Sequence, residues 1–325
     1  MQANSVRIHC QGGPEVLKIE AIDIAAPGAG EVLVRNTAIG LNYQDMYHRS
    51  GLYPLAMPSG LGTEAAGVVE QIGAGVTTLQ VGDHVCYAGG APGACATHRL
   101  MPAARVVRTP EGISDEIAAA VLLKGMTVEY LLNRCCQIRR GDAVLFHAAA
   151  GGVGLLAGQW GAHLGARMVG VAGGAPKVKL ALANGYAECV DRNSEDVSAR
   201  LKAITGGAGF PVAYDSVGAA TFDQTLHALA PRGVFVSFGT TTGAPPAVEA
   251  GTLQKLGSLY FTRPTLVTYT AKAEELQASA KAVFDLILQG VLKVAIHQRY
   301  ALDDIAQAHR DLEGGRTTGS SLIIP

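Results

Sequence analysis

The chain has 325 residues, of which 48% are hydrophobic and 16% are charged. This length favours two domains, and this composition excludes a disordered chain. The 26 basic and 27 acidic side chains give a net charge of -1, without the basic surplus that nucleic-acid binding requires. No apolar stretch is long enough to span a membrane, and residues 1–10 carry no signal sequence. We therefore expect a cytoplasmic protein that binds neither nucleic acid nor membranes.

The six cysteines do not form a metal-binding or disulfide pattern. No C-x-x-C pair occurs, and the only close pair is the adjacent Cys135 and Cys136. Ligands of a zinc site come in spaced clusters, and disulfides are rare in a large cytosolic chain. We therefore expect all six to be small buried hydrophobic residues.

The first hundred residues have a β-rich pattern. Short apolar runs at 32–35, 67–70 and 84–87 lie between turns rich in Gly and Pro, and no helical periodicity persists among them. A helix is expected to begin after Ser114, a good N-cap that two acidic residues follow. Gly125 is a candidate break in this helix before Val128.

From residue 143 the pattern alternates between strand and helix, which is typical of a parallel sheet covered on both faces. An amphipathic helix at 273–289 follows, with Gly290 as its stop, and the chain ends in a short strand. We predict an α/β domain at residues 125–265, inserted in a β-rich domain formed by 1–124 plus 266–325. Within the insert, strands are expected at 144–146, 168–172, 189–190, 212–214 and 234–238, and helices through 155–164, 180–182 and 195–204.

A glycine-rich turn at 149–154 follows the first of these strands and opens a helix. This is the context in which such a motif binds a dinucleotide. Gly151 would let the backbone approach a pyrophosphate, the helix N-terminus would bind it, and Gly154 would allow close packing of helix on strand. Ala149 replaces the usual first glycine. A turn without a ligand is the alternative, which the α/β alternation on both sides disfavours.

The end of the second α/β strand indicates which nucleotide is bound. NAD enzymes place a carboxylate there for the ribose 2′-hydroxyl. Residues 172–177 contain no carboxylate, whereas Lys177 is basic and Arg192 follows the next strand. Either cation alone would be read as solvated surface charge. Together they favour a 2′-phosphate, so we predict NADPH.

Several motifs in one order resemble a known family. The chain is similar, nearly end to end, to the zinc-independent quinone oxidoreductases of the medium-chain dehydrogenase/reductase superfamily, the group that includes zeta-crystallin. The resemblance implies a GroES-like catalytic domain, a Rossmann domain and an active site in the cleft between them. The matching segments are 12–17, 42–45, 49–54, 60–67, 123–127, 146–154, 214–218 and 257–260.

The resemblance also bears on metal binding. Zinc alcohol dehydrogenases of the superfamily carry a histidine where this chain has Thr63, and a cysteine ligand near Asn42, where this chain has none. Their structural lobe of four cysteines is missing as well. We therefore expect no metal, and hydride transfer to an acceptor that is already electrophilic.

By resemblance, the nicotinamide end of the cofactor lies near Asn42, Tyr47, Met126 and Thr127. Relatives often have Tyr at the position of Arg192, so the contact with the 2′-phosphate can differ in detail. The rest of the cofactor is expected near Gly151, Gly152, Val153, Gly173, Lys177, Arg192 and Ser216, with Phe238 and Arg316 also against it.

The predicted function is metal-free, NADPH-dependent reduction of quinones by hydride or electron transfer. We expect Asn42 and Tyr47 to donate hydrogen bonds to a quinone oxygen, Tyr53 to stack on the quinone, and Arg263 to stabilise negative charge. The alternatives are that Tyr53 only packs in the cleft and that Asn42 only holds a turn. His147 ends a buried strand, and we expect it to be structural.

Two other functions stay open at this point. One is reduction of enones or enoyl thioesters on the same fold, and the other is a non-enzymatic crystallin or RNA-binding role. The resemblance also implies a homodimer, with the run Gly257–Phe261 as a sheet edge that can extend across a two-fold axis.

Overall fold

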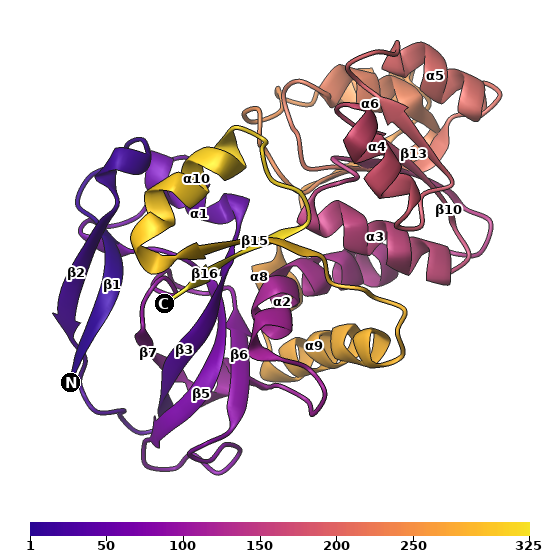
Figure 1. Cartoon of the computed structure of the whole chain (residues 1–325). Coiled ribbons are helices and arrows are strands. Elements are labelled where there is room, and N and C mark those ends of the chain that lie inside the picture. The colour runs from indigo at the N-terminus through magenta and orange to yellow at the C-terminus, as the bar shows by residue number, and fades with distance from the viewer. The chain divides into compact units, whose positions relative to one another are not determined.

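The computed structural model describes residues 1–325, which form two compact units (Figure 1). Unit 1 consists of Met1–Met126, Tyr269–Gly290 and Val294–Pro325. Unit 2 consists of Thr127–Thr268 and Val291–Lys293. The predicted fold class is confirmed, because a parallel α/β unit is inserted in a β-rich unit. No helix of the chain is both long and apolar enough to cross a membrane.

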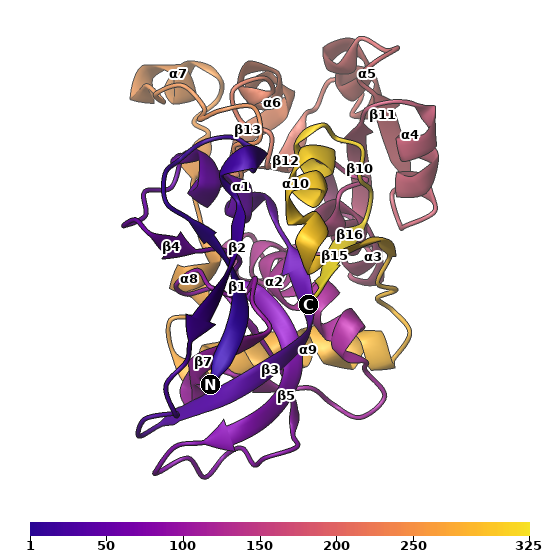
Figure 2. The ribbon, with the colours of Figure 1, turned by 60° about the vertical axis from the view of Figure 1, so that its left-hand side comes forward.

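Unit 1 is built on a seven-stranded sheet of order β15-β16-β3-β5-β6-β8, in which β7 also pairs with β3 (Figure 2). Most neighbours are antiparallel, and β15 with β16 is the parallel pair. A second sheet has the order β2-β1-β4. The strands are β1 Gln2–Ile8, β2 Lys18–Asp23, β3 Glu31–Leu41, β4 Ser59–Gly60, β5 Glu64–Ile72, β6 His84–Ala88, β7 His98–Pro102, β8 Val107–Arg108, β15 Ile296–Ala301 and β16 Ser320–Ile324.

The core of unit 1 lies between these sheets and the helices that cover them. Val32, Val34 and Ile39 of β3 are fully buried in it, together with Val69 of β5 and Ile323 of β16. Alternating apolar residues of a strand point to one face, so burying that face fixes the register of β3 against its neighbours. The helices are η1 Pro14–Val16, α1 Tyr43–Ser50, η2 Ala103–Arg105, α9 Ala273–Leu288, η4 Leu302–Asp304 and α10 Ile305–Glu313.

Helix α1 lies in the part of the chain that is β-rich and shows no persistent helical periodicity in its sequence. Its eight residues are too few for a visible apolar period, but its ends are well specified. A capping box of Asn42 and Asp45 starts it, and Gly51 ends it with φ of 86°. Helix α10 packs beside it.

Helix α2 (Asp115–Glu129) runs without a break through Gly125, which corrects the predicted interruption there. A Cβ at this position would lie 2.6 Å from Cγ1 of Val283 on α9. Glycine therefore serves the close approach of two helices, while the buried residues around it keep the helix intact. A short π-helical segment, η3 Tyr130–Cys135, continues α2.

Unit 2 contains a six-stranded sheet of order β11-β10-β9-β12-β13-β14, parallel throughout. Helices α3 and α4 contact each other, as do α5 and α6. This pairing is consistent with right-handed crossovers, in which one pair of helices covers each face of the sheet. Its elements are β9 Ala143–His147, α3 Gly152–His163, β10 Arg167–Ala172, α4 Ala175–Leu182, β11 Glu188–Asp191, α5 Val197–Ile204, β12 Phe210–Asp215, α6 Phe222–Ala228, β13 Leu229–Ser237, α7 Ala250–Lys255, β14 Tyr260–Thr262 and α8 Leu266–Tyr269.

Candidate functional site

The residues predicted to bind the cofactor follow the carboxyl ends of neighbouring parallel strands in unit 2. The strand order reverses between β9 and β12, and ligands of open α/β sheets bind outside such a switch point. Since the strands are parallel, the loops that follow them gather at one edge of the sheet. Gly151 follows β9, Gly173 follows β10, Arg192 follows β11, Ser216 follows β12, and Phe238 follows β13.

The N-terminus of α3 is built to receive an anion. Gly151 is its N-cap in an extended conformation, and no side chain caps the helix. The first N–H groups of a helix have no partner within it, and they carry the positive end of the helix dipole. Gly152 and Val153 supply such groups next to the switch point, so this end of α3 can hold a pyrophosphate.

Close packing of α3 on the turn before it explains Gly154. A Cβ on Gly154 would lie 2.4 Å from the carbonyl oxygen of Ala148 and 2.6 Å from that of Ala149. Ala148 itself has a φ of 54°, in the left-handed region that alanine rarely adopts. The turn is therefore strained at Ala148, one residue before the alanine that departs from the glycine motif.

A basic corner is formed where β10 and β11 end. Ala172 pairs with Asp191, and the N–H of Arg192 donates to the carbonyl of Ala172 at 2.9 Å. The Arg192 side chain packs against Gly173, because a Cβ there would lie 2.7 Å from the Arg192 Nε. Lys177 lies in the first turn of α4, which begins directly after this loop.

Asp191 is a carboxylate in this corner that sequence reasoning missed, because it comes from the third strand rather than the second. Its Oδ1 accepts the N–H groups of Asn193 at 2.9 Å and Gly174 at 2.7 Å. These two hydrogen bonds, that of Asn193 foremost, lower the pKa of Asp191. The carboxylate therefore joins the two loops instead of standing free for a ribose hydroxyl.

A buried polar network supports the loops on the other side of the switch point. Oδ1 of Asp215 accepts the N–H groups of Val217 and Gly218, and its Oδ2 accepts the Thr225 hydroxyl at 3.0 Å. That hydroxyl also bonds to Nε2 of His147 at 3.0 Å. Burial lowers the pKa of His147. These contacts give His147 a structural place beneath the loop that carries Ser216.

Phe238 and Arg263 lie at the ends of β13 and β14. The ring of Phe238 packs on Phe146 with centroids 5.6 Å apart. Nη1 of Arg263 donates to the Ser237 hydroxyl at 3.2 Å and to the Gly239 carbonyl at 2.9 Å. Arg263 thus belongs to the same unit as the predicted cofactor residues, whereas Asn42, Tyr47 and Tyr53 belong to unit 1.

In unit 1, Asn42 lies in a cluster of buried charges. Its Nδ2 donates to the Gly40 carbonyl at 3.2 Å and to Oε2 of Glu64 at 2.8 Å. Lys124 Nζ lies 3.2 Å from the same carboxylate oxygen. Both amide hydrogens of Asn42 are therefore donated within unit 1, and its predicted hydrogen bond to a quinone stays a prediction.

Asp45 lies in the same cluster. Its Oδ2 accepts the backbone N–H of Asn42 at 2.9 Å, and its Oδ1 is buried without a partner. Burial raises the pKa of Asp45 to about 7, although the Asn42 hydrogen bond and the Lys124 charge lower it. No local sequence pattern predicts this cluster, because Asn42 and Asp45 are far from Glu64 and Lys124 in the chain and only the fold brings them together.

Tyr47 and Tyr53 form an aromatic pair after Asn42. Their ring centroids are 5.1 Å apart in an edge arrangement, and the Tyr53 N–H donates to the Tyr47 carbonyl at 2.9 Å. Helix α1 is held by Arg49, whose Nη1 lies 3.0 Å from Nδ1 of His309 on α10. The two tyrosines are therefore placed on a well-anchored segment.

Met126, Thr127 and Arg316 are the remaining residues that were predicted to lie near the cofactor. Met126 is fully buried and Thr127 is nearly so, both within α2. Arg316 forms an ion pair with Asp311 at 2.7 Å, and it is the first cause of the lowered pKa of that carboxyl. Its predicted contact with the cofactor stays a prediction.

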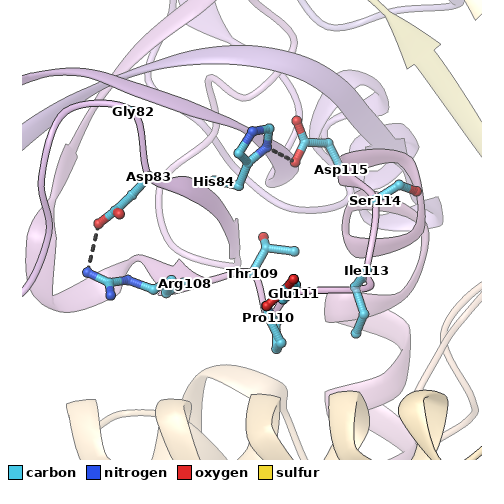
Figure 3. Close-up of a pocket in the computed structure, with 10 residues that line it drawn as sticks. All are labelled: Gly82, Asp83, His84, Arg108, Thr109, Pro110, Glu111, Ile113, Ser114 and Asp115. Carbon is cyan, nitrogen blue, oxygen red and sulfur yellow. Dashed lines mark hydrogen bonds and ion pairs between the residues drawn. The ribbon is translucent and has the colours of Figure 1, made fainter.

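A surface hollow of about 640 Å³ in unit 1 is lined by none of the predicted residues (Figure 3). Four of its ionisable side chains are paired with each other, Asp83 with Arg108 at 2.7 Å and His84 with Asp115 at 2.9 Å. No group of three or more His, Cys, Asp or Glu side chains is arranged to hold a metal ion in the chain.

Comparisons with known proteins agree with this arrangement. Residues 28–132 match the family model described as alcohol dehydrogenase GroES-like domain, and residues 184–323 match the one described as zinc-binding dehydrogenase. A quinone oxidoreductase of Pseudomonas aeruginosa is 47% identical, over 99% of this chain and 100% of its own. The Escherichia coli quinone oxidoreductase complexed with NADPH is 46% identical, with a TM-score of 0.97 over 99% of this chain and 100% of that one.

A GroES-like unit that carries an inserted Rossmann unit defines the medium-chain dehydrogenase/reductase class of oxidoreductases. Within that class, the chain belongs to the quinone oxidoreductase family. A further relative, the 2-haloacrylate reductase of a Burkholderia species, is 38% identical over 98% of both chains.

Proposed function

We propose that the chain is an NADPH:quinone oxidoreductase that works without a metal. The observation that carries this proposal is the uncapped N-terminus of α3 at the switch point of the sheet, together with the basic corner of Arg192 and Lys177, which lies at the same edge of the sheet where β10 and β11 end. Two relatives named quinone oxidoreductase match the full chain at 46–47% identity, and a structure of one of them contains NADPH.

The residues present fit NADPH. The free N–H groups at the start of α3 would bind the pyrophosphate, and Arg192 with Lys177 would bind the 2′-phosphate. The bound cofactor supplies the reducing equivalents of the reaction, by hydride or electron transfer. In sum, NADPH, a proton and a quinone give NADP⁺ and a hydroquinone.

The protein's part is positioning and electrostatics. We expect Tyr47 to donate a hydrogen bond to the quinone oxygen as negative charge develops on it, and Tyr53 to pack on the quinone ring. Arg263 would add positive charge, and Asn42 would act on the cofactor.

The test is steady-state oxidation of NADPH and NADH with 1,4-benzoquinone after exhaustive chelation. We expect full activity with NADPH after treatment with EDTA and 1,10-phenanthroline. Because the 2′-phosphate forms charge-assisted bonds, we expect Lys177→Ala/Arg192→Ala to raise the KM for NADPH by at least about tenfold and to leave the KM for NADH nearly unchanged. Loss of activity on chelation, or equal effects on both cofactors, would contradict the proposal.

Reduction of an electron-poor alkene is the second candidate, because the Burkholderia relative is named a 2-haloacrylate reductase. Both reactions need the same cofactor and differ in the shape of the acceptor pocket. Turnover of a panel of quinones, enones and haloacrylates separates them, since the physiological class should have the highest kcat/KM.

We also propose a cytoplasmic homodimer. Strand β14 is the edge of the six-stranded sheet, and Tyr260 on it is 63% exposed. An open edge of this kind can pair with the same strand of a second copy. Sedimentation equilibrium of the wild type tests this: we expect a dimer, and a monomer would disprove the proposal.

A further inference from the structure

Cys135 and Cys136 are the only cysteines that are neighbours in the sequence, and the proposed function does not use them. Cys135 ends the π-helical segment η3, and Cys136 is its C-cap. Neither residue forms a disulfide and both are partly exposed, so the expectation that all six cysteines are buried is wrong for this pair. Two sulfur ligands therefore lie side by side where a small molecule can reach them.

The two sulfur atoms already face each other. The Cys136 thiol donates a hydrogen bond to the Cys135 sulfur, and the two sulfur atoms are 4.0 Å apart. The backbone N–H of Cys136 donates to the Leu131 carbonyl at 3.3 Å, and the Tyr214 hydroxyl donates to the same carbonyl at 2.7 Å. The turn that presents the sulfurs is therefore anchored to β12 within unit 2.

The spacing of the sulfurs favours a single atom bound to both of them over a direct disulfide. The peptide bond between the two cysteines is trans, and it sets their Cα atoms about 3.8 Å apart. Disulfides usually join Cα atoms that are about 4.4–6.8 Å apart, so a disulfide here would be strained. Two thiolates that each lie about 2.3 Å from one centre, at tetrahedral angles, are about 3.8 Å from each other. That distance is close to the 4.0 Å between these sulfurs.

The number of ligands decides which kind of centre the pair can hold. No group of three or more His, Cys, Asp or Glu side chains that could hold a metal ion includes these cysteines. A structural zinc ion takes four ligands, so two sulfurs do not complete its shell. Soft thiolates bind soft partners, and an organic arsenic(III) group is a soft partner that needs only two of them. Its third bond, in a pyramidal arrangement, goes to its own carbon substituent.

We propose that Cys135 and Cys136 form a chelating site for monosubstituted arsenic(III) compounds, R–As=O. Each sulfur forms one bond to arsenic, the two thiol protons leave with the arsenic-bound oxygen as water, and arsenic stays trivalent. The hydrogen bond with Cys135, together with burial, raises the pKa of the Cys136 thiol. Because the thiolate is the nucleophile, we expect Cys135 to bond to arsenic first and Cys136 to close the ring.

The test uses the reduced full-length protein and phenylarsine oxide, followed by mass spectrometry under native conditions. We expect a single arsenical per chain to remain after washing with an excess of a monothiol, with a mass gain equal to that of the reagent less one water. A dithiol such as 2,3-dimercaptopropanol should remove it. A monothiol should not, because the second sulfur recaptures the arsenic before it can leave.

Cys135→Ser and Cys136→Ser each leave one sulfur, and we expect each to lower the affinity for phenylarsine oxide by at least about a hundredfold. Cys10→Ser is the matched control, because it removes an exposed cysteine that has no cysteine beside it in the chain, and it should keep the wild-type affinity. Thermal unfolding checks that each variant is folded. A wild type without a monothiol-resistant adduct, or a folded serine variant of the pair that keeps it, would overturn the inference.

Discussion

Gly154 is the position in the nucleotide turn that can least accommodate a side chain. We predict that Gly154→Ala lowers the free energy of unfolding by about 1–3 kcal/mol, because its Cβ would clash with the backbone carbonyls of Ala148 and Ala149. The forced shift of α3 should also weaken NADPH binding. Chemical denaturation and calorimetry measure the two effects.

Gly251 in α7 provides the control for that substitution. A Cβ there meets nothing within 4 Å, so Gly251→Ala should be neutral or stabilise the protein by up to about 1 kcal/mol. Equal losses at the two positions would show that the clash does not explain the effect at Gly154.

Asp45 gives the protein an unusual dependence of stability on pH. Its pKa is about 7 in the folded state and 3.8 ordinarily, so between these values the folded protein keeps a proton that the unfolded chain releases. The contribution of Asp45 to stability is therefore present at low pH and is lost as pH rises from about 4 to 7. We predict that Asp45→Asn gains stability relative to the wild type across this window. Unfolding curves from pH 4 to 8 measure it, and a constant difference would refute the assignment.

At the scale of elements, the α/β alternation was predictable because each strand is a continuous apolar run and each helix has an apolar face. The strands β9, β10 and β11 and the helices α3, α4 and α9 follow from these patterns. Helix α1 was not predicted, since its eight residues are mostly polar and too few to stand out among the strands around them. The nucleotide turn was predictable from its flanking elements, whereas Asp191 and the Glu64 cluster depend on strand pairing that no local pattern records.

Gly125 illustrates why a glycine within a helix can be mistaken for a helix break when only the sequence is known. We predict that Gly125→Ala destabilises the protein by about 1–3 kcal/mol, because the new methyl group overlaps Val283 of α9. Val283→Ala in the same chain should recover a part of this loss by removing the overlapping Cγ1. A double-mutant cycle in denaturant measures the coupling. Additive effects would mean that the two helices do not meet at these residues.

At the scale of the whole molecule, the single tryptophan allows unit 2 to be followed by itself. Trp160 is buried in α3, and the chain contains no other tryptophan. A ligand that binds only the folded state stabilises it by about 2.7 kcal/mol at a hundred times its Kd. We predict a stabilisation of this size in unfolding curves followed by Trp160 fluorescence with NADPH. No shift at saturating NADPH would contradict a cofactor site on this unit.

The position of β16 in the seven-stranded sheet has a consequence for biosynthesis. This strand pairs with β3, although nearly the whole chain is translated between the two. All strands of unit 2 lie within residues 143–262, so its sheet can close while the ribosome is still adding residues to the chain. β7 covers residues 31–35 of β3, but until residues 320–324 emerge the segment 39–41 has no neighbour on one side and can pair with other nascent chains. We therefore expect the unit that is begun first to be completed last, with its exposed strand segment as the part of the nascent protein that most needs shielding.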